Sequence, residues 1–167
     1  MKGIQTRCKR ILMSMKKEIN RRKLENMICD FLKTQATCVI ATCSDSIPRA
    51  STVEFFPIAL TIYIITEGGR KVENIRKNPR VSIAVSAPFT GWESLKGLQI
   101  SGTAEIGRKG SAIFAEGIKA YKKRKGLKKV LMPDFMNMVK IIPVEIDYID
   151  AELEKKGYEI RQTISFL

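Results

Sequence analysis

The stretch that decides the fold begins at Pro48-Arg49-Ala50-Ser51-Thr52-Val53-Glu54-Phe55-Phe56 and continues as Leu60-Thr61-Ile62-Tyr63-Ile64-Ile65-Thr66-Glu67-Gly68-Gly69-Arg70-Lys71. It resumes at Asn78-Pro79-Arg80-Val81-Ser82-Ile83-Ala84-Val85 and ends at Gly97-Leu98-Gln99-Ile100-Ser101-Gly102-Thr103-Ala104-Glu105. The pattern predicts strands joined by a glycine turn, an Arg-Lys pair and one short helix over about 70–77. This order is more informative than any single motif in the chain.

Hydrophobic periodicity extends this pattern in both directions. Apolar residues at helical spacing predict helices over about 15–33 and 110–124. Strands are predicted over 36–42, 49–56, 60–66, 81–86, 97–106 and 139–149, with a short last strand in the tail from 157 to 167. Pro57 is expected to end the strand at 49–56, because proline cannot donate to a sheet ladder. Six or seven strands joined mostly locally favour an antiparallel barrel over a doubly wound parallel sheet.

The net charge of +13 is concentrated in two segments. Residues 1–26 hold nine Lys or Arg and two acids, and residues 119–129 hold seven and none. One interpretation is a patch that binds nucleic acid or a membrane surface. The other is a solvated helix face and a solvated loop, which is favoured because no aromatic residues are interleaved for base stacking. A basic N-terminal extension is expected over 1–20, followed by one domain over 21–167.

Several classes of site are excluded by composition. The chain has no histidine, so a Ser-His-Asp triad, a histidine-containing zinc site and a haem with a proximal histidine are impossible. Its four cysteines contain no C-x-x-C pair, which favours free thiols and predicts no metal site. No apolar run is long enough to cross a membrane or to form the core of a secretory signal. A cytoplasmic protein without membrane contact is therefore expected.

The glycine turn prepares a site for an anion. A helix that starts after Gly68-Gly69 offers unpaired backbone N–H groups and the positive end of its dipole. Arg70 and Lys71 add two positive charges there, where the helix dipole alone would favour acids, and a bound phosphate would reverse the sign of that penalty. Arg49 begins a neighbouring strand and can supply a planar, bidentate contact to the same phosphate. The alternative is a surface turn with two solvated cations.

Together these motifs resemble the pyridoxamine 5'-phosphate oxidase-like family of FMN-binding split barrels. The resemblance covers about residues 22–106 and, more loosely, 139–149. It implies a mainly β (α+β) fold: an antiparallel split β-barrel of about six strands with short peripheral helices. It also implies FMN as cofactor and a homodimer with the flavin at the interface. The residues that match the cofactor-binding positions are Arg49, Ala50, Ser51, Thr52, Ile65, Thr66, Arg70 and Lys71.

Two further residues are candidates for flavin contact. Gln99 lies on the polar face of its strand, where it can meet the flavin of a second subunit. Trp92 is the only tryptophan, and it can stack on the isoalloxazine ring or instead cover the end of the barrel. No side chain is an evident acid or base, so no catalytic residue is assigned. The expected activity is that of an FMN-dependent oxidoreductase of unidentified substrate, with NAD(P)H or another small molecule as electron donor.

The chain departs from the family's oxidases at two points. Those enzymes carry a substrate-binding lysine at the position of Glu54 and a C-terminal Arg-x-His, and this chain has no histidine. Oxidation of pyridoxine phosphate is therefore not expected. The family also contains flavin reductases, nitroimidazole reductases, haem-degrading enzymes and deazaflavin-dependent reductases. Two other hypotheses stay open: a basic nucleic-acid-binding β-barrel that uses 119–129, and a flavin storage or sensor module without turnover.

Overall fold

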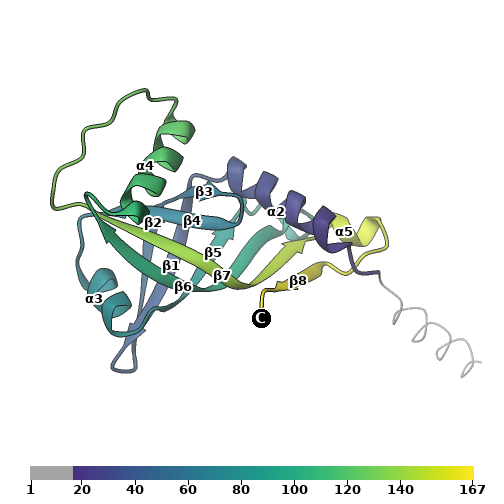
Figure 1. The fold of residues 1–167 in the computed structure, drawn as a ribbon. Helices are drawn as coiled ribbons and strands as arrows, with labels where there is room; N and C mark the ends of the chain where they lie inside the picture. The colour runs from purple at the N-terminus through teal and green to yellow at the C-terminus, as the bar shows by residue number, and fades with distance from the viewer. Residues whose placement is uncertain (1–16) are drawn as a thin grey trace, which may run out of the picture.

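Alternating apolar and polar residues place one face of each strand in a common core. The computed structural model describes residues 17–167, which form one antiparallel sheet of eight strands with helices at its periphery (Figure 1). The helices are α2 (Arg21–Thr34), α3 (Arg70–Lys77), α4 (Ala112–Lys125), α5 (Glu152–Lys155) and the 3-10 helix η2 (Trp92–Ser94). The strands are β1 (Thr37–Ser44), β2 (Ile47–Glu54), β3 (Phe56–Ile58), β4 (Thr61–Thr66), β5 (Arg80–Ser86), β6 (Lys96–Arg108), β7 (Asn137–Asp150) and β8 (Arg161–Ser165).

The sheet is a split barrel, as expected. Its strand order is β2-β1-β5-β6-β7-β4-β3, and β8 pairs with β7. The two end strands, β2 and β3, do not pair with each other, although β2 contacts β4. The prediction of an antiparallel split barrel is confirmed, with eight strands where about six were predicted.

Pro57 does not end a strand, which corrects the sequence prediction. β2 ends at Glu54, and Pro57 is the middle residue of the short strand β3, opposite Ile62 of β4. β3 is the last strand of the sheet, so its outer side needs no backbone donor. A proline is tolerated there for that reason.

Two apolar clusters hold the sheet. The larger one fills the barrel beneath α2 and includes Ile28, Leu32, Ile40, Ile83 and Ile100, each at most 1% exposed. The smaller one lies between α4 and the outer side of β3, β4 and β7, and its buried members are Phe56, Tyr63, Phe114, Ala120 and Met138. β4 is therefore packed on both faces, which accounts for its continuous apolar run.

The outer face of β2, β1, β5 and β6 carries small side chains. Cross-strand pairs on this face include Ala41 with Ala50, Ala41 with Ser82, and Ser82 with Ser101. A hollow of about 740 Å³ lies on it, lined among others by Cys43, Thr103 and Leu167. No residue of a described helix lines this hollow. Helix α4 lies over β3 and β4 instead (Figure 1).

Gly102 is required by the close approach of β7. The register of β6 and β7 shifts between Ser101 and Gly102, and a Cβ added to Gly102 would lie 2.8 Å from the Ile142 backbone oxygen. Because a backbone atom in a paired strand cannot move aside, any side chain here strains the sheet.

Gly102→Val is expected to lower the free energy of unfolding by about 1–3 kcal/mol. Strand propensity alone predicts the opposite, since valine favours strands and glycine does not. Ser101→Val is the matched control, because Ser101 is exposed on the same strand. Urea denaturation compares the two variants. Equal midpoints for Gly102→Val and the unmodified protein would contradict the steric argument.

The basic segment 119–129 is mostly helical, and one of its cations has a structural role. Residues 119–125 form the last turns of α4, so only the remainder is the solvated loop that the sequence suggested. Arg124 Nη1 donates to the Leu32 carbonyl at 3.3 Å, and its Nη2 donates to the Gln35 carbonyl. The guanidinium also lies 5.6 Å from the centre of the Phe55 ring. Arg124 thus caps the carbonyl end of α2 and joins it to α4.

Arg124→Gln is expected to lower the free energy of unfolding by about 1.5 kcal/mol. This is the lower end of the range for hydrogen bonds to a charged group, and it applies because Arg124 is only half-buried. Lys123→Gln removes the same charge from the same helix at an exposed position and serves as the control. Thermal denaturation of both variants tests this. Equal melting temperatures of the two variants would contradict the structural role of Arg124.

The predicted N-terminal extension covers residues 1–20. Its first sixteen residues lie outside the described part of the chain. Residues 17–20 pack against the domain: Ile19 is buried, and its amide donates to Gln162 Oε1 at 2.8 Å. Within residues 17–167, no helix combines the length and the apolar character needed to cross a membrane.

Candidate functional site

Helix α3 is fixed to the β1–β2 hairpin by side-chain hydrogen bonds. Asn74 Nδ2 donates to Thr42 Oγ1 at 3.1 Å, and Asn74 Oδ1 accepts from Ser44 Oγ at 2.8 Å. One turn further, Asn78 Nδ2 donates to the Cys43 carbonyl at 3.0 Å. The hairpin turn itself, Asp45-Ser46, has positive φ angles, which match the right-handed twist of the strands it joins. The helix therefore has a defined position on the hairpin (Figure 1).

Arg49 lies on the face of the hairpin that α3 covers. The two-residue turn sets Arg49 opposite Thr42, and cross-strand partners project from the same face. Thr42 is buried and bonded to Asn74, whereas Arg49 is exposed at the edge strand. Arg70 and Lys71 precede Asn74 by four and three residues, so they share its flank of α3. Arg49, Arg70 and Lys71 are thus brought to one side of the molecule.

The first turn of α3 presents free backbone donors. Gly69 is its N-cap, with φ 76°, and supplies no side-chain cap. Its carbonyl accepts from Val72 and Glu73, while the amides of Gly69, Arg70 and Lys71 have no acceptor among residues 17–167. A cavity of about 430 Å³ opens here, lined by Thr66, Glu67, Gly68, Gly69 and Lys71. An anion in this cavity would satisfy these donors.

The three cations of this side have no acidic partner within 4 Å in the described chain. The neighbouring Lys77 does have one: it pairs with Asp45 at 2.9 Å, and its hydrogen bond holds the pKa of Asp45 below the usual value. Arg49, Arg70 and Lys71 therefore carry uncompensated charges near the hairpin. They are available to an anionic ligand.

The remaining predicted residues divide between the two faces of the sheet. Ser51 shares the face of Arg49, whereas Ala50 and Thr52 lie on the outer face with its small side chains. Gln99 is also on the outer face, where its Oε1 accepts from Arg161 Nη1 at 3.2 Å. Within one chain, Gln99 and the three cations lie on opposite sides of the sheet.

Thr66 supports the glycine turn. It is buried at the end of β4, and its hydroxyl accepts from the Gly68 amide at 3.3 Å.

The structure separates Ile65 and Trp92 from the three cations. Ile65 packs in the cluster beneath α4. Trp92, 79% exposed, follows β5 and contacts Phe89, whereas α3 precedes β5. Trp92 and α3 are therefore at opposite ends of β5.

Glu54 has a partner that the sequence did not reveal. Its carboxylate accepts a hydrogen bond from Lys125 Nζ at the end of α4, and both side chains are about 40% exposed. Sequence reasoning also missed Thr42 and Asn74, which position α3. No spacing signal identifies such pairs, because their contacts depend on how α3 lies on β1.

Comparison with known proteins gives one family. Residues 24–149 match the model of pyridoxamine 5'-phosphate oxidase. The comparison with curated proteins finds no match. Among solved structures, a candidate pyridoxamine 5'-phosphate oxidase of Listeria innocua is 21% identical, with TM-score 0.61, covering 76% of this chain and 98% of that one.

Two other similar structures have different ligands in their names. An FAD-binding protein of Mesorhizobium loti is 18% identical, with TM-score 0.58, covering 72% of this chain and 90% of that one. The heme storage protein of Vibrio cholerae is 20% identical, also with TM-score 0.58, covering 72% and 89%. At these identities the structural likeness establishes a shared fold.

Proposed function

The chain belongs to the pyridoxamine 5'-phosphate oxidase family, and from that premise we propose that it binds FMN and acts as a small oxidoreductase. One observation carries the proposal: three uncompensated cations, Arg49, Arg70 and Lys71, share one side of the hairpin with the unpaired amides of α3. Cationic side chains and helix amides are the donors that a phosphate monoester requires.

These residues fit the phosphate end of the cofactor. Arg49 offers a bidentate guanidinium, Lys71 a point charge beside the 430 Å³ cavity, and the first turn of α3 its backbone donors. Thr66 accepts a hydrogen bond from the Gly68 amide and so holds the glycine turn that precedes this helix end. When bound, the flavin supplies the electron-accepting chemistry. The chain's own residues bind and orient it, and no described side chain is needed as acid or base for hydride transfer.

The outer face of the sheet supports a homodimer as part of this proposal. Small side chains line part of its 740 Å³ hollow, with Arg80 beside them, and Val39, 37% exposed, and Ile142, 41% exposed, add apolar area. A second copy placed there would bring its own Gln99 and small residues toward this face. Two copies would then enclose the flavin ring that one chain leaves open.

Haem is the cofactor that one structural neighbour stores, but this chain lacks the usual protein ligand for it. No residue of the sequence is histidine, so ligation by a proximal histidine is impossible. The cation cluster matches a phosphate, but it would also match the haem propionates, so the missing histidine carries the distinction. Flavin is accordingly the better supported cofactor.

The proposal is tested by loading the purified protein with FMN, removing free ligand and recording the absorbance spectrum. Retained flavin bands are expected, and their absence would refute flavin binding. Anaerobic titration with NADH and with NADPH then follows. Bleaching of the flavin supports an oxidoreductase, whereas a flavin that no donor reduces indicates a storage or sensor module.

A further inference from the structure

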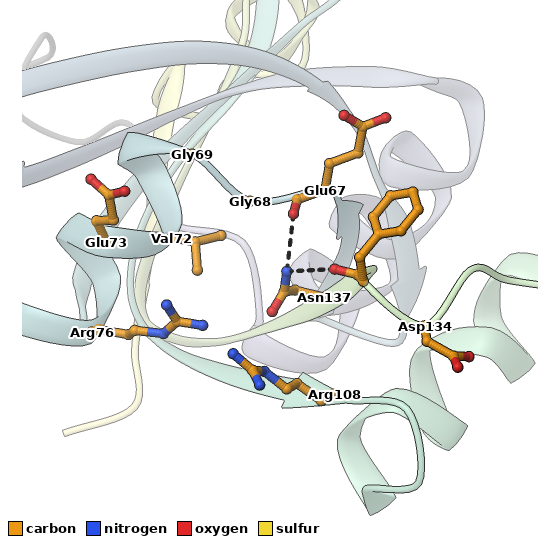
Figure 2. A pocket seen from close by; sticks show the side chains of 10 residues that line it. Glu67, Gly68, Gly69, Val72, Glu73, Arg76, Arg108, Asp134 and Asn137 are labelled. Atoms are coloured by element: carbon orange, nitrogen blue, oxygen red, sulfur yellow. Dashed lines mark hydrogen bonds between the residues drawn. The ribbon is translucent and has the colours of Figure 1, made fainter.

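A second pocket lies on the other flank of α3, and two arginines face each other across it. It has a volume of about 420 Å³ and is lined by Gly68, Gly69, Arg76, Arg108 and Asn137, and also by the acidic residues Glu67, Glu73 and Asp134. Arg76 comes from the last turn of α3 and Arg108 from the end of β6. Figure 2 shows the two guanidinium groups pointing toward one another across this pocket.

This pocket borders the same Gly68-Gly69 turn as the cavity of the proposed flavin phosphate site, but its cations are different ones. Successive residues of an α-helix are rotated by about 100°, so Arg76 lies about 140° from Lys71 around the axis of α3. Lys71 shares its flank with Asn74, which contacts the β1–β2 hairpin, whereas Arg76 faces β6. The buried residues Val72 and Ile75 lie between the two flanks. One phosphate cannot contact both sets of cations.

The two arginines have no counter-charge of their own. Neither has an acid within 4 Å in the described chain. The nearby Asp134 pairs with Lys109 at 2.5 Å. In Figure 2 the carboxylates of Glu67 and Glu73 point away from the space between the guanidiniums. Two like charges that face each other without a partner repel, and a bound anion would attract both and outweigh that repulsion.

Asn137 and the glycine turn do not compete for this space. Asn137 is buried, and its Nδ2 donates to the carbonyls of Glu67 at 3.3 Å and Phe135 at 3.2 Å, which fixes the wall of the pocket (Figure 2). Gly68 and Gly69 contribute no side chains, so the backbone borders the pocket directly. The guanidiniums are therefore the side-chain hydrogen-bond donors left to bind an anion.

We infer that Arg76 and Arg108 form a binding site for the phosphate group of a small molecule other than the bound flavin. Two guanidiniums from different elements suit a doubly charged phosphate, since each can donate two parallel hydrogen bonds. The volume accommodates a phosphate with a small organic group attached. The site does not depend on the proposed function, because it shares no cation with the flavin phosphate site.

The test is a calorimetric titration of the FMN-loaded protein with inorganic phosphate, with sodium chloride at matched ionic strength as reference. Saturable binding of one phosphate per chain is expected, with no equivalent heat from chloride. The double variant Arg76→Gln/Arg108→Gln should lose at least about tenfold in phosphate affinity and keep its affinity for FMN. The exposed pair Lys123→Gln/Lys156→Gln removes the same charge and should leave phosphate binding unchanged.

A parallel titration of the variant Arg49→Gln/Lys71→Gln without FMN separates the two sites. Phosphate binding that survives there and is lost with Arg76 and Arg108 supports the second site, even if FMN binding fails. Phosphate that binds no better than chloride, or equally well to the Arg76→Gln/Arg108→Gln variant, would overturn the inference.

Discussion

FMN is expected to bind this protein about a hundredfold more tightly than riboflavin, with a dissociation constant in the micromolar range or below. The two ligands differ only in the phosphate, so the ratio of their affinities measures the phosphate site alone. Charge-assisted hydrogen bonds contribute about 1.5–3 kcal/mol each, and two such bonds at the lower value give about 3 kcal/mol, or a hundredfold. Arg49 and Lys71 are the side chains that we expect to provide them.

Fluorescence titration with both ligands measures this ratio. In Arg49→Gln/Lys71→Gln the affinity for FMN should fall to nearly that for riboflavin, while riboflavin itself binds as before. Lys77→Gln is the matched control, because Lys77 belongs to the same helix but is paired with Asp45. Equal affinities of the unmodified protein for FMN and riboflavin would refute the phosphate site.

Pyridoxine phosphate is expected not to be oxidised, even by protein fully loaded with FMN. The family's oxidases carry a cation at the position of Glu54, and a carboxylate there repels the substrate phosphate. The ion pair with Lys125 reduces this negative charge without reversing it. A turnover assay that detects product from the unmodified protein would contradict this expectation.

The ion pair also determines which variants are informative. Glu54→Lys alone places two cations side by side at the end of α4, so its effect mixes substrate binding with local repulsion. The exchange Glu54→Lys/Lys125→Glu keeps one charge of each sign and is the cleaner test. Activity of the exchanged variant would assign the defect to Glu54, while its inactivity would point to the missing histidine.

The ends of helices and strands were predictable where glycine or proline marks them in the sequence. Helix α3 spans Arg70–Lys77, as predicted, because Gly68-Gly69 opens it and Asn78-Pro79 closes it. In β5 and β6, Val81, Ile83, Leu98 and Ile100 alternate with polar or small residues in the sequence, and all four are buried. Short-range rules suffice for such features, since the residues that decide them are neighbours in the chain.

Tertiary partners were not predictable in the same way. Arg124 appeared to be one of several solvated cations, yet it caps a helix that ends about ninety residues earlier. Arg76 and Arg108 meet across a pocket only because β6 returns beside α3. The extra strand β3 was missed because a proline suggests a break, and only the sheet order shows that it lies at an edge.

The place of β7 in the sheet has a consequence for synthesis on the ribosome. β7 lies between β6 and β4, and it begins only at Asn137, so β4 has no partner on that side until most of the chain has been translated. Until then the nascent chain exposes the ladder edges of both β4 and β6, which invite pairing with other chains. A chain that stalls before Asn137 is therefore the species most in need of chaperone protection.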